Sequence, residues 1–294
     1  MRFGVVILPE HPWTEARHLW RRAEELGFDH AWTYDHLTWA PLPDAPWFGA
    51  VPTLAAAALV TTRVRLGTYV ASPNFRHPVP FAQELMSLDD LSDGRLLVGL
   101  GSGGDLDAGA LHPGGLSRGR RTERFADFVE LLDPLLRGER VSARGRHFSA
   151  GDVRLRPGCR QRPRAPFVVS ANGPRAMEVV ARHGEGWVTT GVPSDDPQQW
   201  WATVARLAAR LDDVLEESNR AFPLLDRYLS LDASGTFSLS SVAAFEDAVG
   251  RAADLGFTDV VCHWPRSEGP YAGHVATLER VASEVLPRWR DQPG

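Results

Sequence analysis

An acid and a histidine stand side by side as Asp35 and His36, directly after the apolar run of residues 30–34. An imidazole can accept or donate a proton near neutral pH, so this pair could act as acid and base in a reaction. A carboxylate pair of Glu10 and Asp35 for glycoside hydrolysis also stays open, because nothing in the sequence sets the distance between the two acids. The alternative is an ordinary polar loop, since a histidine at a strand end is more often structural.

A second group of residues could bind an anion. Residues 170–177 read SANGPRAM, in which Pro174 begins a helix just after a strand. A helix start offers free backbone N–H groups and the positive end of the helix dipole, and both suit a phosphate. Residues 189–191 would add hydroxyl groups beside it. The alternative is a tight turn that merely caps the helix.

Several other chemistries are excluded because the sequence lacks the residue types or motifs that they need. The 32 basic residues are all arginine, because the sequence has no lysine. This excludes Schiff-base catalysis, pyridoxal chemistry and a P-loop. No HxH follows the first strand and no GxSxG elbow occurs, and we expect no metal site. Gly99, Gly101 and Gly104 match GxGxxG, but they follow the fourth strand and lead into residues 105–119, which we expect to be loop. A dinucleotide fold is therefore disfavoured.

Buried strands alternate with amphipathic helices along the whole chain and would position these residues. Eight short apolar runs, each followed by a helical pattern, are typical of parallel strands that are covered on both faces. The runs are residues 3–8, 30–34, 64–70, 95–101, 167–171, 186–190, 227–232 and 259–264. Eight such units without a linker predict an α/β fold, a single (β/α)8 TIM barrel that forms one domain over residues 1–294.

The rules of such a barrel predict where the site lies. Active sites form at the C-terminal ends of the strands, where Trp39, Trp47, Phe48 and Trp264 suggest an aromatic pocket. Residues 139–166 would be a long irregular excursion between the fourth helix and the fifth strand. Three glycines would end helices in the left-handed conformation, namely Gly27, Gly184 and Gly256.

The composition limits the classes of partner that we expect this protein to bind. A net charge of -5 and a pI of about 6.1 do not indicate a nucleic-acid or membrane partner. No apolar run reaches the ~18 residues of a membrane span, and the N-terminus lacks a signal-peptide pattern. Cys159 and Cys262 form neither a metal-like pair nor a disulfide framework. We therefore expect a soluble cytoplasmic protein that acts on a small molecule.

Four stretches carry a resemblance to a known family. They are residues 27–36 (GFDHAWTYDH), 65–78 (RLGTYVASPNFRHP), 88–104 (LDDLSDGRLLVGLGSGG) and 173–191 (GPRAMEVVARHGEGWVTTG). From Phe3 to about Gly191 the chain resembles the luciferase-like flavin or deazaflavin oxidoreductases. The resemblance implies the same eightfold barrel, with FMN or the deazaflavin coenzyme F420 held at the C-terminal rim of the strands.

The resemblance also implies roles for individual residues. His36 and Asp35 would be catalytic, with His36 as proton donor or acceptor at the reactive ring edge. A cis peptide bond would join Tyr69 and Val70. The cofactor-binding residues would be Trp39, Tyr69 and Val70 around the ring, Ser102, Gly103 and Gly104 where the backbone passes close to it, and Ala171, Asn172, Gly173, Thr189, Thr190 and Gly191 around the phosphate.

Three activities stay open under this resemblance. The favoured one is F420-dependent hydride transfer to or from a C=C, C=N or carbonyl/alcohol group. The alternative is an FMN-dependent monooxygenase that uses reduced flavin and O2, and the third is a catalytically silent flavin-binding protein. A separate flavin or F420 reductase and a homodimer would be the protein partners. The arginines of residues 154–164 could meet the acidic tail of F420 or form an ordinary surface loop. The lack of lysine disfavours a sugar-phosphate substrate.

Overall fold

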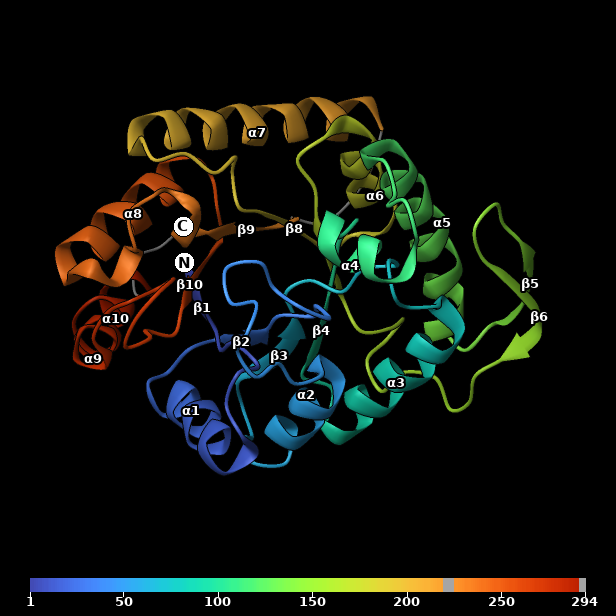
Figure 1. Cartoon of the computed structure of the whole chain (residues 1–294), viewed down its shortest axis with the longest axis horizontal. Helices are drawn as coiled ribbons and strands as arrows, with labels where there is room; N and C mark the ends of the chain where they lie inside the picture. The colour runs from blue at the N-terminus through green and yellow to red at the C-terminus, as the bar shows by residue number, and fades with distance from the viewer. Residues whose placement is uncertain (219–224, 291–294) are drawn as a thin grey trace.

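Eight parallel strands close into a barrel in the computed structural model, which describes residues 1–218 and 225–290 (Figure 1). Around the ring the strand order is β1-β10-β9-β8-β7-β4-β3-β2. The strands are β1 (Arg2–Val6), β2 (His30–Thr33), β3 (Arg65–Thr68), β4 (Leu96–Leu100), β7 (Phe167–Ser170), β8 (Gly186–Thr189), β9 (Asp226–Ser230) and β10 (Asp259–His263). The predicted barrel is confirmed, and each strand begins and ends within two residues of its predicted run.

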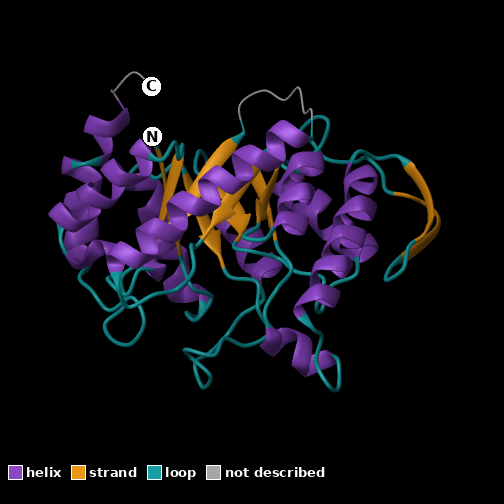
Figure 2. Cartoon of the chain, turned by 90° about the horizontal axis from the view of Figure 1, so that it is seen from above, coloured by secondary structure: helices purple, strands orange, loops and turns teal. Residues whose placement is uncertain are grey.

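Helices surround the barrel, as Figure 1 shows. They are α1 (Trp13–Glu25), α2 (Ala50–Ala58), α3 (Pro78–Leu91), α4 (Asp105–Leu111), α5 (Arg118–Leu136), α6 (Pro174–His183), α7 (Pro197–Glu217), α8 (Val242–Asp254), α9 (Val275–Glu284) and α10 (Leu286–Arg290). Figure 2 shows the N-terminus at one end of the barrel and the long loops at the other end. The loop end is the C-terminal rim, where we expect the site.

Three local predictions are wrong. Residues 139–166 are not irregular throughout, because β5 (Arg140–Arg144) and β6 (Ser149–Arg154) pair as an antiparallel hairpin on the outer side of α5 (Figures 1 and 2). Part of the expected loop 105–119 forms α4. Gly184 has a φ of -80°, whereas Gly27 and Gly256 are left-handed as predicted. A Cβ atom on Gly184 would lie 3.0 Å from the Gly186 carbonyl oxygen, so crowding explains this glycine.

Because the hairpin packs on α5, we propose that residues 1–294 form one domain.

The barrel interior is apolar and grades into aromatic residues at the C-terminal rim. One buried cluster fills it, made of Val6, Leu8, Trp32, Tyr69, Leu97, Val168, Val188, Tyr228 and Val261. Partly buried Tyr34, Trp39, Leu42, Trp47, Val70 and Tyr271 pack against this cluster. Side chains at the rim therefore lie next to an apolar interior of low dielectric constant, where electrostatic interactions are stronger than in water.

A buried acid closes the N-terminal end of the barrel. Asp259 is fully buried and accepts hydrogen bonds from His30 Nε2 at 3.0 Å and from Arg2 at 2.6 and 2.9 Å. Burial raises the pKa of the Asp259 carboxyl, but the hydrogen bond and charge of His30, followed by those of Arg2, outweigh it. The pKa of Asp259 therefore lies below its ordinary value.

Asp259→Asn should lower the free energy of unfolding by about 3 kcal/mol near neutral pH, because the change leaves His30 and Arg2 without their carboxylate. Because the folded-state pKa of Asp259 is lowered, its contribution is fully present above the unfolded pKa of about 4 and is lost as the pH falls through the folded value. Urea unfolding at decreasing pH should show the gap between the two proteins narrowing below about pH 4. A gap that stays constant in acid would contradict this account.

Candidate active site

His36 follows β2 and forms a pair with an acid that sequence reasoning missed. Its Nδ1 lies 2.6 Å from Oδ2 of Asp107, and the other oxygen of Asp107 accepts the backbone N–H of Leu37 at 2.9 Å. The Asp107 side chain is 1% exposed and that of His36 is 25% exposed. Because a carboxylate only accepts, Nδ1 carries the hydrogen, and in the neutral form of the ring Nε2 has a lone pair. Nε2 is thus able to take up a proton from a bound molecule.

Two acids follow the glycines of strand four, and they differ in role. The Asp105 side chain is 86% exposed and pairs with Arg121, whereas Asp107 turns inward to His36. Both lie in the first turn of α4, where the helix dipole favours acidic residues. The sequence signal was an acid soon after the glycines. Which acid meets His36 depends on the rotation of α4, which is set only when the helix packs.

Asp35 is buried and both of its oxygens are engaged. The Arg76 guanidinium donates to them at 2.6 and 2.7 Å, and it also donates to Glu84 at 3.0 Å. Asp35 therefore ties the end of β2 to the segment that leads into α3. This contact positions the backbone that carries His36.

A cluster of aromatic rings begins next to His36. The Tyr34 ring centroid lies 5.7 Å from that of His36 and 5.3 Å from that of Trp39. Trp39 stacks on Trp47 at 5.9 Å, and on Tyr271 at 5.9 Å. The Trp47 indole N–H donates to the His36 carbonyl at 2.9 Å. The expected wall at Trp39 is thus part of a larger aromatic cluster. We call Tyr34, Trp39, Trp47 and Tyr271 the aromatic wall.

The ends of β3 and β4 pack unusually close together. The peptide bond between Tyr69 and Val70 is cis, which confirms the expectation from the resemblance. A Cβ atom on Gly101 would lie 2.6 Å from Val70 Cγ2, and one on Gly99 would overlap the Thr68 carbonyl oxygen. The spacing of these glycines therefore reflects strand packing and not a dinucleotide site.

The segment after β4 presents backbone to the rim. Gly103 has a φ of +70°, and a Cβ atom there would overlap Asn74 Nδ2 and lie 2.6 Å from Ser72 Oγ. Asn74 Nδ2 also donates to the Gly104 carbonyl at 3.1 Å. At Gly104 no atom lies within 4 Å of the Cβ direction. Glycine is thus required at Gly103, whereas Gly104 leaves open space above the rim. Ser102 is partly exposed there.

The start of α6 has the features of an anion site. Gly173 is its N-cap residue, and no side chain accepts from the first amides, whereas His77, Ser117, Asp196 and Ser241 cap α3, α5, α7 and α8. No atom lies within 4 Å of the Cβ direction at Gly173. Arg210 approaches from α7 and donates to the Asn172 carbonyl at 3.3 Å. Free amides, open space and a nearby guanidinium fit a phosphate.

The loop after β8 is bound to this helix start. Asn172 Nδ2 donates to the Gly191 carbonyl at 2.9 Å, and Thr189 Oγ1 donates to Asn172 Oδ1 at 2.7 Å. Thr189 is fully buried, so it shapes the loop, while Thr190 is exposed. The Ala171 carbonyl accepts the Trp187 indole N–H at 2.7 Å. Of the predicted phosphate residues, Thr190 is exposed and Asn172 and Gly173 are partly exposed, whereas Ala171, Thr189 and Gly191 are buried.

The predicted residues occupy five consecutive strands of the ring. His36 follows β2, Tyr69 and Val70 follow β3, and Ser102 to Gly104 follow β4. Ala171 to Gly173 follow β7, and Thr189 to Gly191 end or follow β8. Sequence reasoning missed Asp107, Tyr34 and Tyr271. An elongated cofactor could lie along this arc, with its phosphate at α6 and its ring beside His36.

The arginine-rich loop lies at the other end of the barrel. Gln161 donates to the Leu96 carbonyl, where β4 begins, and Arg164 binds Glu185, just before β8. Arg164 also pairs with Asp133 of α5. This position favours the ordinary surface loop over a contact of residues 154–164 with the acidic tail of F420. These arginines anchor the loop to the closed end of the barrel.

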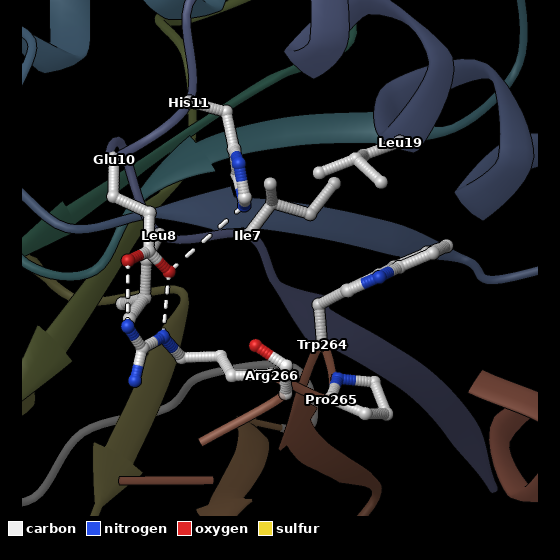
Figure 3. A pocket seen from close by; sticks show the side chains of 9 residues that line it. Ile7, Leu8, Glu10, His11, Leu19, Trp264, Pro265 and Arg266 are labelled. Atoms are coloured by element: carbon white, nitrogen blue, oxygen red, sulfur yellow. Dashed lines mark hydrogen bonds and ion pairs between the residues drawn. The ribbon is translucent and has the colours of Figure 1, made fainter. Parts of the chain in front are cut away.

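A cavity of about 230 Å³ lies between the loops after β1 and β10, at the C-terminal rim of the barrel (Figure 3). We call the opening of the barrel at this rim the mouth. Its lining comprises Ile7, Leu8, Glu10, His11, Leu19, Trp264, Pro265, Arg266 and Ser267. Arg266 donates to Glu10 at 2.7 and 2.8 Å, as the dashed lines show. None of the predicted cofactor-binding residues lines this cavity. Within residues 1–218 and 225–290, no helix is long and apolar enough to cross a membrane, and no acid, histidine or cysteine cluster could hold a metal ion.

A model of the luciferase-like monooxygenase family matches residues 1–223. The chain belongs to the luciferase-like monooxygenase family. It is 30% identical over 319 residues to the F420-dependent glucose-6-phosphate dehydrogenase of Beutenbergia cavernae, with 91% of each chain covered. It is also 30% identical over 236 residues to the F420-dependent hydroxymycolic acid dehydrogenase of Mycobacterium tuberculosis, covering 79% of this chain and 60% of that one.

A solved structure supports the fold of this luciferase-like chain. The coenzyme F420-dependent tetrahydromethanopterin reductase of Methanopyrus kandleri superposes with a TM-score of 0.78 at 18% identity, over 98% of this chain and 99% of that one. At this identity the likeness shows the fold alone. Together with the family match, it confirms the luciferase-like barrel that the sequence predicted.

Gly103→Ala should destabilise the protein by about 2–4 kcal/mol, because the left-handed backbone and the overlap with Asn74 both disfavour a side chain. Gly104→Ala is the matched control and should change the free energy of unfolding by less than about 0.5 kcal/mol, since its Cβ would point into open space. Thermal and urea unfolding of both variants measure the difference. Equal effects of the two changes would show that the packing of Gly103 on Asn74 is misassigned.

Proposed function

We propose that this chain is an F420-dependent oxidoreductase that transfers a hydride between the deazaflavin and a small organic substrate with a C=C, C=N or carbonyl/alcohol group. The observation that carries the proposal is the His36–Asp107 pair, which shares a rim with the uncapped start of α6. Relatives named as F420-dependent, at 30% identity, support the choice of cofactor. F420 would supply or accept the hydride, and the protein would supply the proton chemistry.

Each residue of the pair has a separate role in this proposal. His36 Nε2 takes a proton from the substrate or returns one to it. Asp107 holds the hydrogen on Nδ1, which leaves Nε2 as the proton-accepting nitrogen of the neutral ring, and the carboxylate stabilises the imidazolium that forms. Asp35 acts through Arg76 as a positioning residue and does not touch the reacting atoms.

The cofactor would be held by the remaining rim residues. Trp39, Tyr69 and Val70 would bound the ring, and Ser102, Gly103 and Gly104 would let it approach the backbone. The amides at Gly173 and Arg175, with the hydroxyl of Thr190, would bind the phosphate. Ala171, Asn172, Thr189 and Gly191 would keep that loop in shape.

An FMN-dependent monooxygenase that uses reduced flavin and O2 is the second candidate. The name of the family favours it, and the same open cradle at Gly173 suits the FMN phosphate. A separate flavin or F420 reductase, a homodimer and a cytoplasmic location stay predictions. The two buried thiols, Cys159 and Cys262, agree with a reducing compartment.

Gly173→Val should weaken F420 binding at least tenfold, roughly the effect of losing one hydrogen bond to a charged group, because the side chain would fill the space above the α6 amides. The fold should stay intact, since φ at Gly173 is -111°. Gly151→Val on the outer hairpin is the control, because no atom lies within 4 Å of its Cβ direction either. Fluorescence titration with F420 and, separately, FMN measures binding. Tighter binding of FMN than of F420 would favour the monooxygenase. Unchanged affinity in Gly173→Val would show that the cofactor phosphate does not bind at the start of α6.

Asp107→Asn should free the imidazole of His36 to adopt both neutral tautomers, because an amide can donate as well as accept. Nitrogen-15 NMR of the histidine ring should show mostly the Nδ1–H form in the parent protein and a mixture in the variant. Turnover with F420 should fall about 100-fold or more, in line with general acid–base catalysis. The control Asp105→Asn should change neither signal. A variant that keeps the parent tautomer would show that Asp107 does not orient His36.

A further inference from the structure

The cavity between the loops after β1 and β10 borders the layer of helices outside the barrel (Figure 3). Two of its lining residues, Ile7 and Trp264, belong to the buried cluster that joins the strands to the helices, and Leu19 of α1 packs against the same cluster. Leu8 belongs to the cluster of the barrel interior. The cavity is therefore separate from the arc of rim residues that would hold the cofactor.

Contacts between the two loops fix one polar side of the cavity. Arg266 donates to both carboxylate oxygens of Glu10, at 2.7 and 2.8 Å, and its third guanidinium nitrogen donates to the Glu268 carbonyl at 2.6 Å. The Arg266 backbone N–H donates to the Tyr271 carbonyl at 3.0 Å, which closes the loop after β10 on itself. The walls of the cavity are thus formed before a ligand binds, as is usual for small-molecule sites.

The side of the cavity away from Glu10 is apolar and carries an indole N–H. Figure 3 shows Leu19 and Trp264 on this side. Trp264 is 8% exposed, and no described residue accepts a hydrogen bond from its indole N–H. The indoles of Trp32 and Trp187, by contrast, donate at 2.6 and 2.7 Å. Because a buried donor without a partner costs free energy, Trp264 favours a ligand that brings an acceptor.

The volume and the lining limit the size of that ligand. The cavity measures about 230 Å³. Apolar protein cavities of about 150 Å³ can hold benzene, so this cavity has room for a single ring with a small substituent. Ile7, Leu19 and Pro265 offer apolar surface to such a ring.

The charges around the cavity disfavour a charged ligand. An anion would meet the carboxylate of Glu10 and also that of Glu15, whose Oε2 lies 3.7 Å from Nδ1 of the lining residue His11. All three guanidinium nitrogens of Arg266 already have acceptors. A cation would lose its water beside Glu10, whose charge Arg266 already balances, and would leave the Trp264 N–H without an acceptor. A neutral ligand avoids both costs.

We propose that this cavity is a second binding site, which takes a neutral ring compound with a carbonyl oxygen, such as an aromatic amide. The Trp264 indole N–H donates to that oxygen, and the ring packs between the loops after β1 and β10. The inference goes beyond the proposed function, because the site is separate from the centre at His36 and does not depend on the cofactor.

Benzamide, benzoate and benzamidine test the class of ligand, because they have nearly the same shape but are neutral, anionic and cationic. In calorimetry without cofactor, benzamide should bind at least about fivefold more tightly than either charged compound, the effect of one neutral hydrogen bond. Adding F420 should not displace it. Equal or tighter binding of a charged compound, no binding of benzamide, or its displacement by F420 would overturn the proposal.

Leu19→Phe tests the location, because the larger side chain would take up part of the cavity. Benzamide affinity should fall about tenfold or more. Leu59→Phe is the control and should leave the affinity unaltered, since Leu59 lies at the end of α2 and is 72% exposed.

Nitrogen-15 NMR of the indole groups tests the hydrogen bond directly. The Trp264 signal, identified by its loss in Trp264→Phe, should shift when benzamide is added, while the signal of Trp39 in the aromatic wall should stay in place. A Trp39 signal that shifts while that of Trp264 does not would place benzamide in the mouth and overturn the proposal. An unchanged Trp264 signal at saturating benzamide would likewise remove this residue from the site.

Discussion

Closure of eight parallel strands into one ring is the constraint on which the rest of the structure depends. Parallel strands end at the same edge, so residues far apart in the chain meet on a single rim. His36 after β2 and Gly173 after β7 are separated by two intervening strands of the ring, although 137 positions separate them in the chain. The chemistry of this protein is therefore a property of strand ends, and each loop contributes to a frame that the barrel has already set.

The apolar interior of the barrel strengthens the polar contacts placed above it. Buried carboxylates at Asp35, Asp107 and Asp232 each receive hydrogen bonds that replace water. In so dry a setting an unpaired charge would be costly, so each acid comes with a specific partner. Two of these pairs have different roles. The Asp35–Arg76 pair fixes the backbone near His36, while Asp107 fixes the hydrogen on the His36 ring.

The barrel could be predicted from the sequence, because strands buried on both faces must be apolar throughout and their lengths repeat. The positions of His36 and of the segment at Gly173 on the rim could be predicted for the same reason, since they directly follow such strands. The β5–β6 hairpin was not, because it is exposed on one side and carries arginines, so its apolar pattern is too short to read. Asp107 and Tyr271 lie in segments without periodicity, and their partners are set by tertiary packing alone.

The arginine pairs at the rim have a consequence for how the mouth responds to its surroundings. Guanidinium groups keep their charge at any pH that a cell reaches, and here they are locked to carboxylates at Glu10 and Asp35. A change of pH within the neutral range therefore leaves these guanidinium charges in place. Arg266 keeps the loops after β1 and β10 joined, and Arg76 keeps the end of β2 joined to the segment before α3.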